Sequence, residues 1–155
     1  MAKFLYGDRI GKQASVRLGC SATIFDDSRQ KILLTRRTDN GLWCLPGGGV
    51  DAGESVSEAC EREVLEETGL VVRVKKLFGV YSDPHRIVEY ADGNQFQIVA
   101  LNFEAEVVGG ELIVSEETTA AHFFDREQMK TLDIMEPHRV RLEDVFANRG
   151  SPFIR

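Results

Sequence analysis

Three glutamates, Glu63, Glu66 and Glu67, are spaced three and four residues apart, or adjacent, within one short stretch. At these spacings they share one side of an α-helix, where like charges repel one another. The apolar residues that mark the inward face of the same helix are Val56, Ala59, Cys60 and Val64. This stripe continues onto Glu63 and Glu67, with Glu66 beside them, so carboxylates are predicted on or at the edge of the inward side. Mg²⁺ or Mn²⁺ would resolve the conflict, because these ions prefer carboxylate oxygens.

A solvated acidic face is the alternative explanation of this cluster. Glutamates on such a face would point outward and would have lysines four residues away. Only Arg62 is close in sequence, and the acids lie in the C-terminal half of the helix, where the macrodipole disfavours negative charge. The spacing therefore favours a site for a divalent metal ion over a solvated surface.

The helix that carries the glutamates has clear ends in the sequence. Ser55-Val56-Ser57-Glu58 forms a capping box, so the helix is predicted to begin at Val56. Gly69 is a suitable residue just beyond a helix C-terminus, so the helix is predicted to end near Thr68.

The rest of the chain contains strand patterns with two further helices. The predicted strands are 17–25, 31–37, 42–46, 72–81, 87–90, 96–107, 111–114 and 120–124. Strands 17–25 and 31–37 are predicted to form an antiparallel hairpin around Asp26-Asp27-Ser28, and helices are predicted over 126–132 and 137–148. This order predicts an α/β fold of one domain, residues 1–155, with a mixed sheet covered on both faces. The first fifteen residues have no clear pattern and would wrap either the domain or a partner subunit.

The segment from Gly48 to Leu70 resembles the Nudix box at every defined position. The matching residues are Gly48, Glu54 and the run Arg62-Glu63-Val64-Leu65-Glu66-Glu67-Thr68-Gly69-Leu70. Arg36-Arg37 and Leu45-Pro46-Gly47-Gly48-Gly49 before the box extend the similarity. The resemblance implies a Nudix-type α/β/α sandwich with a mixed β-sheet and a catalytic loop–helix–loop.

The resemblance also implies roles for individual residues. Residues matching Glu63, Glu66 and Glu67 hold Mg²⁺ or Mn²⁺ in this family, and the carbonyl of the residue matching Gly48 often joins them. The residue matching Arg62 orients a glutamate, and the residue matching Glu54 is mainly structural. The general base is left open between Glu63 and an acid in the loop at Glu116-Glu117, where we select Glu117.

The implied activity is hydrolysis of the diphosphate bond in a nucleoside diphosphate linked to another moiety. Such a reaction needs neutralised phosphoryl oxygens and an activated water, which bound divalent ions supply. Oxidised dGTP, ADP-ribose, other nucleotide sugars and capped RNA ends all remain open as substrates. Two alternatives are a non-catalytic Nudix-like module that binds nucleotides for regulation and an isomerase of prenyl diphosphates. The first usually lacks box carboxylates, and the second needs a catalytic cysteine for which Cys44 and Cys60 lack the context.

Three residues outside the box are candidates for contacting the substrate. Arg37 would bind a phosphate or base, or would lie on the surface without a role. Trp43, the only tryptophan, would stack on a base or would anchor the core. Tyr81, with Asp83 and His85, falls where substrate-choosing loops lie in the family.

The composition limits the partners of the protein. Its formal charge of −6 and pI of about 5.1 argue against general binding to nucleic acid, leaving a small nucleotide substrate. No apolar run reaches the length of about 20 residues that a membrane span needs. Three scattered cysteines predict buried thiols in a reducing, cytoplasmic setting, without a disulfide framework or a zinc requirement. A homodimer is compatible with the family.

Overall fold

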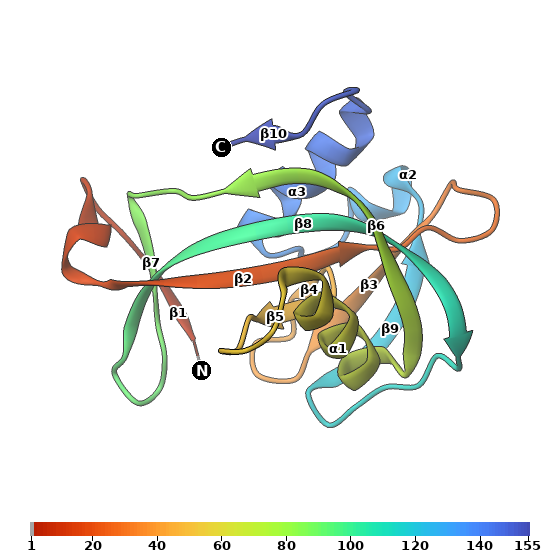
Figure 1. Ribbon diagram of the computed structural model, residues 1–155, viewed down its shortest axis with the longest axis horizontal. Helices are drawn as coiled ribbons and strands as arrows, with labels where there is room; N and C mark the ends of the chain where they lie inside the picture. Colours follow the sequence, from red (N-terminus) through yellow and green to blue (C-terminus); the bar gives the residue numbers. More distant parts are fainter. Residues whose placement is uncertain (1) are drawn as a thin grey trace.

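A long mixed β-sheet runs through the centre of the protein in a computed structural model, which describes residues 2–155. Its strands are β1 (Lys3–Tyr6), β2 (Ser15–Thr23), β5 (Gly47–Gly49), β6 (Leu70–Tyr81), β7 (Arg86–Glu89), β8 (Gln95–Gly110) and β10 (Phe153–Ile154). Strand β8 pairs in parallel with β2 and antiparallel with β6 and β7, which confirms the predicted mixed sheet (Figure 1). The glycine-rich strand β5 lies antiparallel to β2 at the edge of this sheet.

A smaller sheet contains β4 (Trp43–Cys44), β3 (Ile32–Arg37) and β9 (Thr118–Phe124). The predicted hairpin between residues 17–25 and 31–37 is therefore wrong. The two segments meet only at an isolated bridge between Phe25 and Ile32. Both edges of β2 are occupied by β8 and β5, so β3 must find its partners in another sheet. The turn was recognisable from local residues, but the long-range pairing was not.

Helix α1 (Val56–Thr68) has the ends predicted from the sequence. The Ser55 hydroxyl accepts a hydrogen bond from the Glu58 backbone N–H at 3.1 Å, and the Glu58 carboxylate accepts one from the Ser55 N–H at 2.7 Å. At the other end Gly69 has a φ of 74°, which favours glycine, and its N–H donates to the Leu65 carbonyl at 2.9 Å. These local hydrogen bonds fix the length of the helix that carries the glutamates.

Two separate clusters of buried side chains hold the helices in place. The inward residues Ala59, Cys60 and Val64 of α1 pack against the large sheet. Helix α3 (Glu136–Ala147) packs in the other cluster through Leu142 and Val145. Figure 1 shows α1 and α3 on opposite sides of β2, β6 and β8, consistent with the predicted three layers.

The C-terminal third departs from the prediction in three places. Helix α2 (Arg126–Met129) is shorter than predicted, whereas α3 has Pro137 in its first turn as predicted. The predicted strand 111–114 is absent, because β8 continues to Gly110 and the chain then leaves the sheet at a φ of 78°. The short strand β10 was not predicted, and it pairs in parallel with β6.

The N-terminal segment folds back on its own chain. Strand β1 pairs antiparallel with β7, and a 3₁₀-helix, η1 (Ile10–Gln13), follows. All three cysteines are buried and unpaired, which confirms the predicted buried thiols. Among residues 2–155, no helix combines the length and the apolar character needed to cross a membrane.

Candidate active site

Strand β5 and helix α1 bring two of the three predicted glutamates to the glycine backbone. The Glu67 carboxylate accepts a hydrogen bond from the Gly47 N–H at 3.0 Å. The Glu63 carboxylate lies so close to Gly48 that a Cβ atom there would collide with it. Because Gly47 and Gly48 pair with Ser21 and Cys20 of β2, the sheet fixes the position of this backbone.

Burial gives both inward glutamates unusual protonation behaviour. Desolvation raises the pKa of Glu67 to about 8, and the charges of Glu63 and Glu117 add to this effect, while the Gly47 N–H opposes it. The pKa of Glu63 is also raised, first by desolvation and then by the charges of Glu66 and Glu117, against the stabilising effect of Arg62. The helix therefore holds two carboxylates whose charges are incompletely compensated by the protein.

Arg62 is the centre of an ion-pair network beside these glutamates. Its guanidinium donates to Glu54 through Nε and Nη2, to Glu63 at 3.0 Å and to Glu66 at 3.2 Å. A further bond from Nη2 reaches the Gly49 carbonyl at 3.1 Å. The hydrogen bonds from Arg62 hold the pKa of Glu54 at about 2, so Glu54 is a fixed anion. The network thus connects the loop before α1 to Glu63.

Glu66 differs from its two neighbours. Its side chain is 58% exposed, whereas that of Glu63 is 15% exposed, and it contacts Arg62. Within residues 2–155, no three acidic, histidine or cysteine side chains converge tightly enough to enclose a metal ion. Nevertheless, Glu67 forms no ion pair with a described side chain, and it lies in the electrostatic field of two further carboxylates. This oxygen-rich, anionic donor set fits a hard divalent cation.

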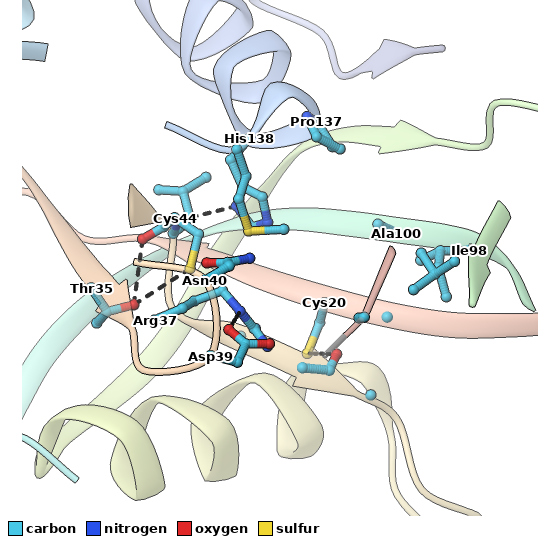
Figure 2. Close-up of a pocket in the computed structure, with 18 of the residues that line it drawn as sticks. Cys20, Thr35, Arg37, Asp39, Asn40, Cys44, Ile98, Ala100, Pro137 and His138 are labelled. Carbon is cyan, nitrogen blue, oxygen red and sulfur yellow. Dashed lines mark hydrogen bonds and ion pairs between the residues drawn. The ribbon is translucent and has the colours of Figure 1, made fainter. Parts of the chain in front are cut away.

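A cavity of about 400 Å³ extends from these carboxylates toward α3. Glu67, Glu117 and the backbone of Gly47 to Gly49 line one part of it, and Arg37 lines it as well. Figure 2 shows Arg37 beside Asp39, to which it donates two hydrogen bonds of 2.8 and 2.9 Å. The same view shows His138 and Pro137 of α3 across the cavity from α1. A ligand could therefore contact both helices at once.

Comparison with known proteins supplies the family. A model of the NUDIX domain matches residues 16–145 of the chain. The chain belongs to the Nudix family. An ADP-ribose pyrophosphatase from Methanocaldococcus jannaschii is 42% identical over 105 residues, which cover 66% of this chain and 59% of that protein. A MutT-like protein from Streptomyces ambofaciens is 35% identical, covering 81% of this chain and 73% of that protein.

The fold comparison agrees with the family assignment. A crystal structure of a NUDIX hydrolase from Nitrosomonas europaea superposes with a TM-score of 0.74 at 22% identity, covering 91% of this chain and 79% of the other. At this identity the likeness concerns the fold, a Nudix α/β/α sandwich. Residues 16–145, which the NUDIX domain model matches, include β5 and α1, whereas β1 and β10 lie outside them.

Two of the three predicted substrate contacts lie away from the Nudix cavity. Trp43 packs edge-on against Phe124, with ring centroids 4.9 Å apart, in the core cluster beneath α3. Tyr81 is 5% exposed, and its hydroxyl donates to Asp144 at 3.0 Å. Neither side chain lines the cavity, so the structure does not bring them together with Glu67 and Arg37. Aromatic packing explains the placement of Trp43, and burial with an occupied hydroxyl explains that of Tyr81.

Among the cavity residues that the sequence interpretation missed are His138 and Arg141 on α3. They share a helical face with the buried Leu142 and Val145. One signal could have found Arg141: it is a charged residue on the apolar face of its helix. The same kind of signal identified the glutamates of α1. Asp83 and His85, which were considered with Tyr81, do not line the cavity either.

Alanine substitutions at the two adjacent glycines should have different effects on stability. In Gly47→Ala the new Cβ would meet the Cys20 carbonyl and Ser21 Cα, so the pairing of β5 with β2 must open. In Gly48→Ala it would meet only the end of the flexible Glu63 side chain. We expect Gly47→Ala to lose about 2 kcal/mol or more of unfolding free energy, and Gly48→Ala less than about 1 kcal/mol. Urea unfolding measures both values, and equal losses would contradict the tight contact of β5 with β2.

Proposed function

We propose that this Nudix protein is a divalent-metal-dependent pyrophosphohydrolase. Its substrate would be a nucleoside diphosphate linked to another moiety, cleaved at the diphosphate bond. The observation that carries the proposal is the pair Glu63 and Glu67, both partly buried and held beside the β5 backbone, with Glu67 lining the end of the cavity. Carboxylates whose charges are incompletely compensated at this position cost stability, so a role in binding cations accounts for their presence.

The donor residues would be Glu63 and Glu67, with Glu66 and the Gly48 carbonyl joining them. A bound Mg²⁺ or Mn²⁺ would neutralise phosphoryl oxygens and lower the pKa of a coordinated water. We propose that Arg62 orients Glu63 through their 3.0 Å hydrogen bond, and that the Gly47 N–H orients Glu67. Glu117 lines the same cavity, so it or Glu63 would accept the proton of the attacking water.

Arg37 is the proposed substrate contact near these carboxylates. It lines the cavity, and its charge is shared with Asp39, so a phosphate of the substrate would meet a partly compensated guanidinium. The relative from Methanocaldococcus jannaschii carries the name ADP-ribose pyrophosphatase, which places ADP-ribose first in a substrate panel. Oxidised dGTP and nucleotide sugars complete the panel. We also propose a cytoplasmic location, which the three free thiols support.

The test is hydrolysis of this panel by the purified protein with Mg²⁺ or Mn²⁺. We expect at least one compound to be cleaved at its diphosphate, the activity to disappear with excess chelator, and either ion to restore it. Zinc should not be required, since the proposed donors are carboxylate and carbonyl oxygens, which suit Mg²⁺ or Mn²⁺. Full activity in chelator would contradict the metal dependence. Tight binding of a panel member without cleavage under any of these ions would instead favour a regulatory nucleotide-binding module.

A further inference from the structure

Arg141 on α3 is a buried cation that faces the cavity without a counter-ion. It is 7% exposed and lines the cavity. Its only hydrogen bond in the described structure is from Nη1 to the Ser21 hydroxyl at 3.3 Å, and its buried Nε has no partner. No carboxylate of residues 2–155 lies within ion-pair distance of it. Because a guanidinium has five N–H donors, most of its bonding capacity is unused.

His138, one turn before Arg141, presents a second donor to the same cavity. Its Nδ1 accepts a hydrogen bond from the Leu45 N–H at 3.1 Å, so the proton of the neutral ring is on Nε2. Burial, and then the charges of Arg141, Arg37 and Arg86, hold the pKa of His138 well below its usual value. The ring is therefore neutral near pH 7, with one free N–H.

Two other arginines of the cavity already have acidic partners, whereas Arg17 lies over the rings of Tyr90 and Phe96. Arg37 pairs with Asp39, and Arg86 pairs with Glu136 at 3.2 Å. Arg141 thus has the one uncompensated charge among these three. Burial, with the nearby charge of Arg86, lowers the pKa of Arg141 to about 10. Burying a guanidinium without a partner is costly, and a neutral hydrogen-bond acceptor would leave its charge uncompensated. A bound anion would supply both the hydrogen bonds and the opposite charge.

We propose that the α3 part of the cavity binds an anionic group of the substrate, a phosphate or a carboxylate, distinct from the diphosphate that is cleaved. Arg141 supplies the charge and the fork of N–H donors, and the Nε2–H of His138 supplies one more. The inference rests on the proposed function, because the anion belongs to the same substrate. Since α1 and α3 lie across the cavity from one another, this contact would orient the substrate along it (Figure 2). It predicts that, within the panel, oxidised dGTP with its third phosphate is preferred over ADP-ribose, whose only anionic group is the diphosphate itself.

Thermal unfolding in excess chelator tests the subsite without any hydrolysis. Inorganic phosphate and acetate are added separately, with chloride keeping the ionic strength constant. Without metal, the glutamates at the α1 end offer an anion no cation to bind, so a specific anion response must come from another part of the cavity. We expect at least one of the two anions to raise the melting temperature of the wild-type protein by a few degrees. A rise in melting temperature with phosphate alone would identify a phosphoryl subsite, and a rise with acetate alone would identify a carboxylate subsite.

Three variants assign the response to Arg141. Arg141→Met keeps an unbranched apolar chain in place of the arginine stem, removes the guanidinium and should abolish the response, while its ligand-free melting temperature stays equal to or above that of the wild type. Arg141→Lys should retain part of the response. Arg139→Met, which changes an exposed arginine of the same helix, should behave like the wild type. Absence of an anion response in the wild type, or an equal response in Arg141→Met, would overturn the proposal, as would marked ligand-free destabilisation of Arg141→Met.

The result is separable from the test of hydrolysis. A protein that binds the anion through Arg141 but cleaves nothing would contradict the proposed activity alone. A protein that hydrolyses the panel but shows no anion response would contradict only the subsite.

Discussion

Glu67→Gln is expected to lower kcat about 10²-fold or more while the far-UV circular dichroism spectrum stays unchanged. The substitution keeps the size and the helix propensity of the side chain and removes its charge. A glutamine oxygen can still accept the 3.0 Å hydrogen bond from the Gly47 N–H, so the local backbone should not move. What disappears is a negative charge at the end of the cavity, where the cation that neutralises the phosphates would bind. Steady-state kinetics on the best substrate of the panel measures the loss.

Glu58→Gln is the matched control on the same helix. Glu58 is exposed and belongs to the capping box, where its carboxylate accepts the Ser55 N–H at 2.7 Å. Glutamine can make the same bond, so the expected cost is a few tenths of a kcal/mol, with kcat nearly intact. If both variants lost activity equally, Glu67 would have no special role and the hydrolase proposal would lose its main support.

The helix and its acids could be predicted because their signals are local. A capping box and a glycine at positive φ are decided by hydrogen bonds within a few residues of each helix end. The inward direction of Glu63 and Glu67 follows from the same 3.6-residue period as the apolar face. Glu66, at the edge of that face, turned outward, because Arg62 offers it a partner four residues away.

The lining of the cavity could not be predicted, because it depends on contacts between distant segments. Arg141 reaches Ser21 across 120 positions of sequence, and His138 reaches Leu45 across 93. The sequence did not show that Trp43 and Tyr81 lie outside this cavity, because an aromatic side chain near a binding loop serves equally well as core packing. The pairing of β2 with β8 instead of β3 is likewise a long-range choice.

Glu67→Gln should also change how the stability of the metal-free protein depends on pH. The pKa of Glu67 is about 8 in the folded state against an ordinary value of 4.5, so the folded protein holds this proton more tightly. Wild-type stability should therefore fall between pH 4.5 and 8, by up to about 1.4 kcal/mol per pH unit from this residue. Glutamine cannot ionise, so at pH 7 in chelator the variant should be more stable than the wild type by on the order of 2–3 kcal/mol. Urea unfolding at pH 5, 6, 7 and 8 measures the difference.

In the same urea series, the Glu58→Gln control should change the unfolding free energy in the opposite direction to Glu67→Gln. Hydrogen bonds from Ser55 lower the pKa of Glu58, so its carboxylate stabilises the fold at neutral pH and loses this effect as pH falls through the folded pKa. The control should therefore be slightly less stable than the wild type at pH 7. Mg²⁺ should then stabilise the wild type and Glu58→Gln by mass action, and Glu67→Gln much less. A metal-free Glu67→Gln protein clearly less stable than the wild type at pH 7 would show that the Glu67 charge is compensated within the fold, leaving no electrostatic demand for a cation.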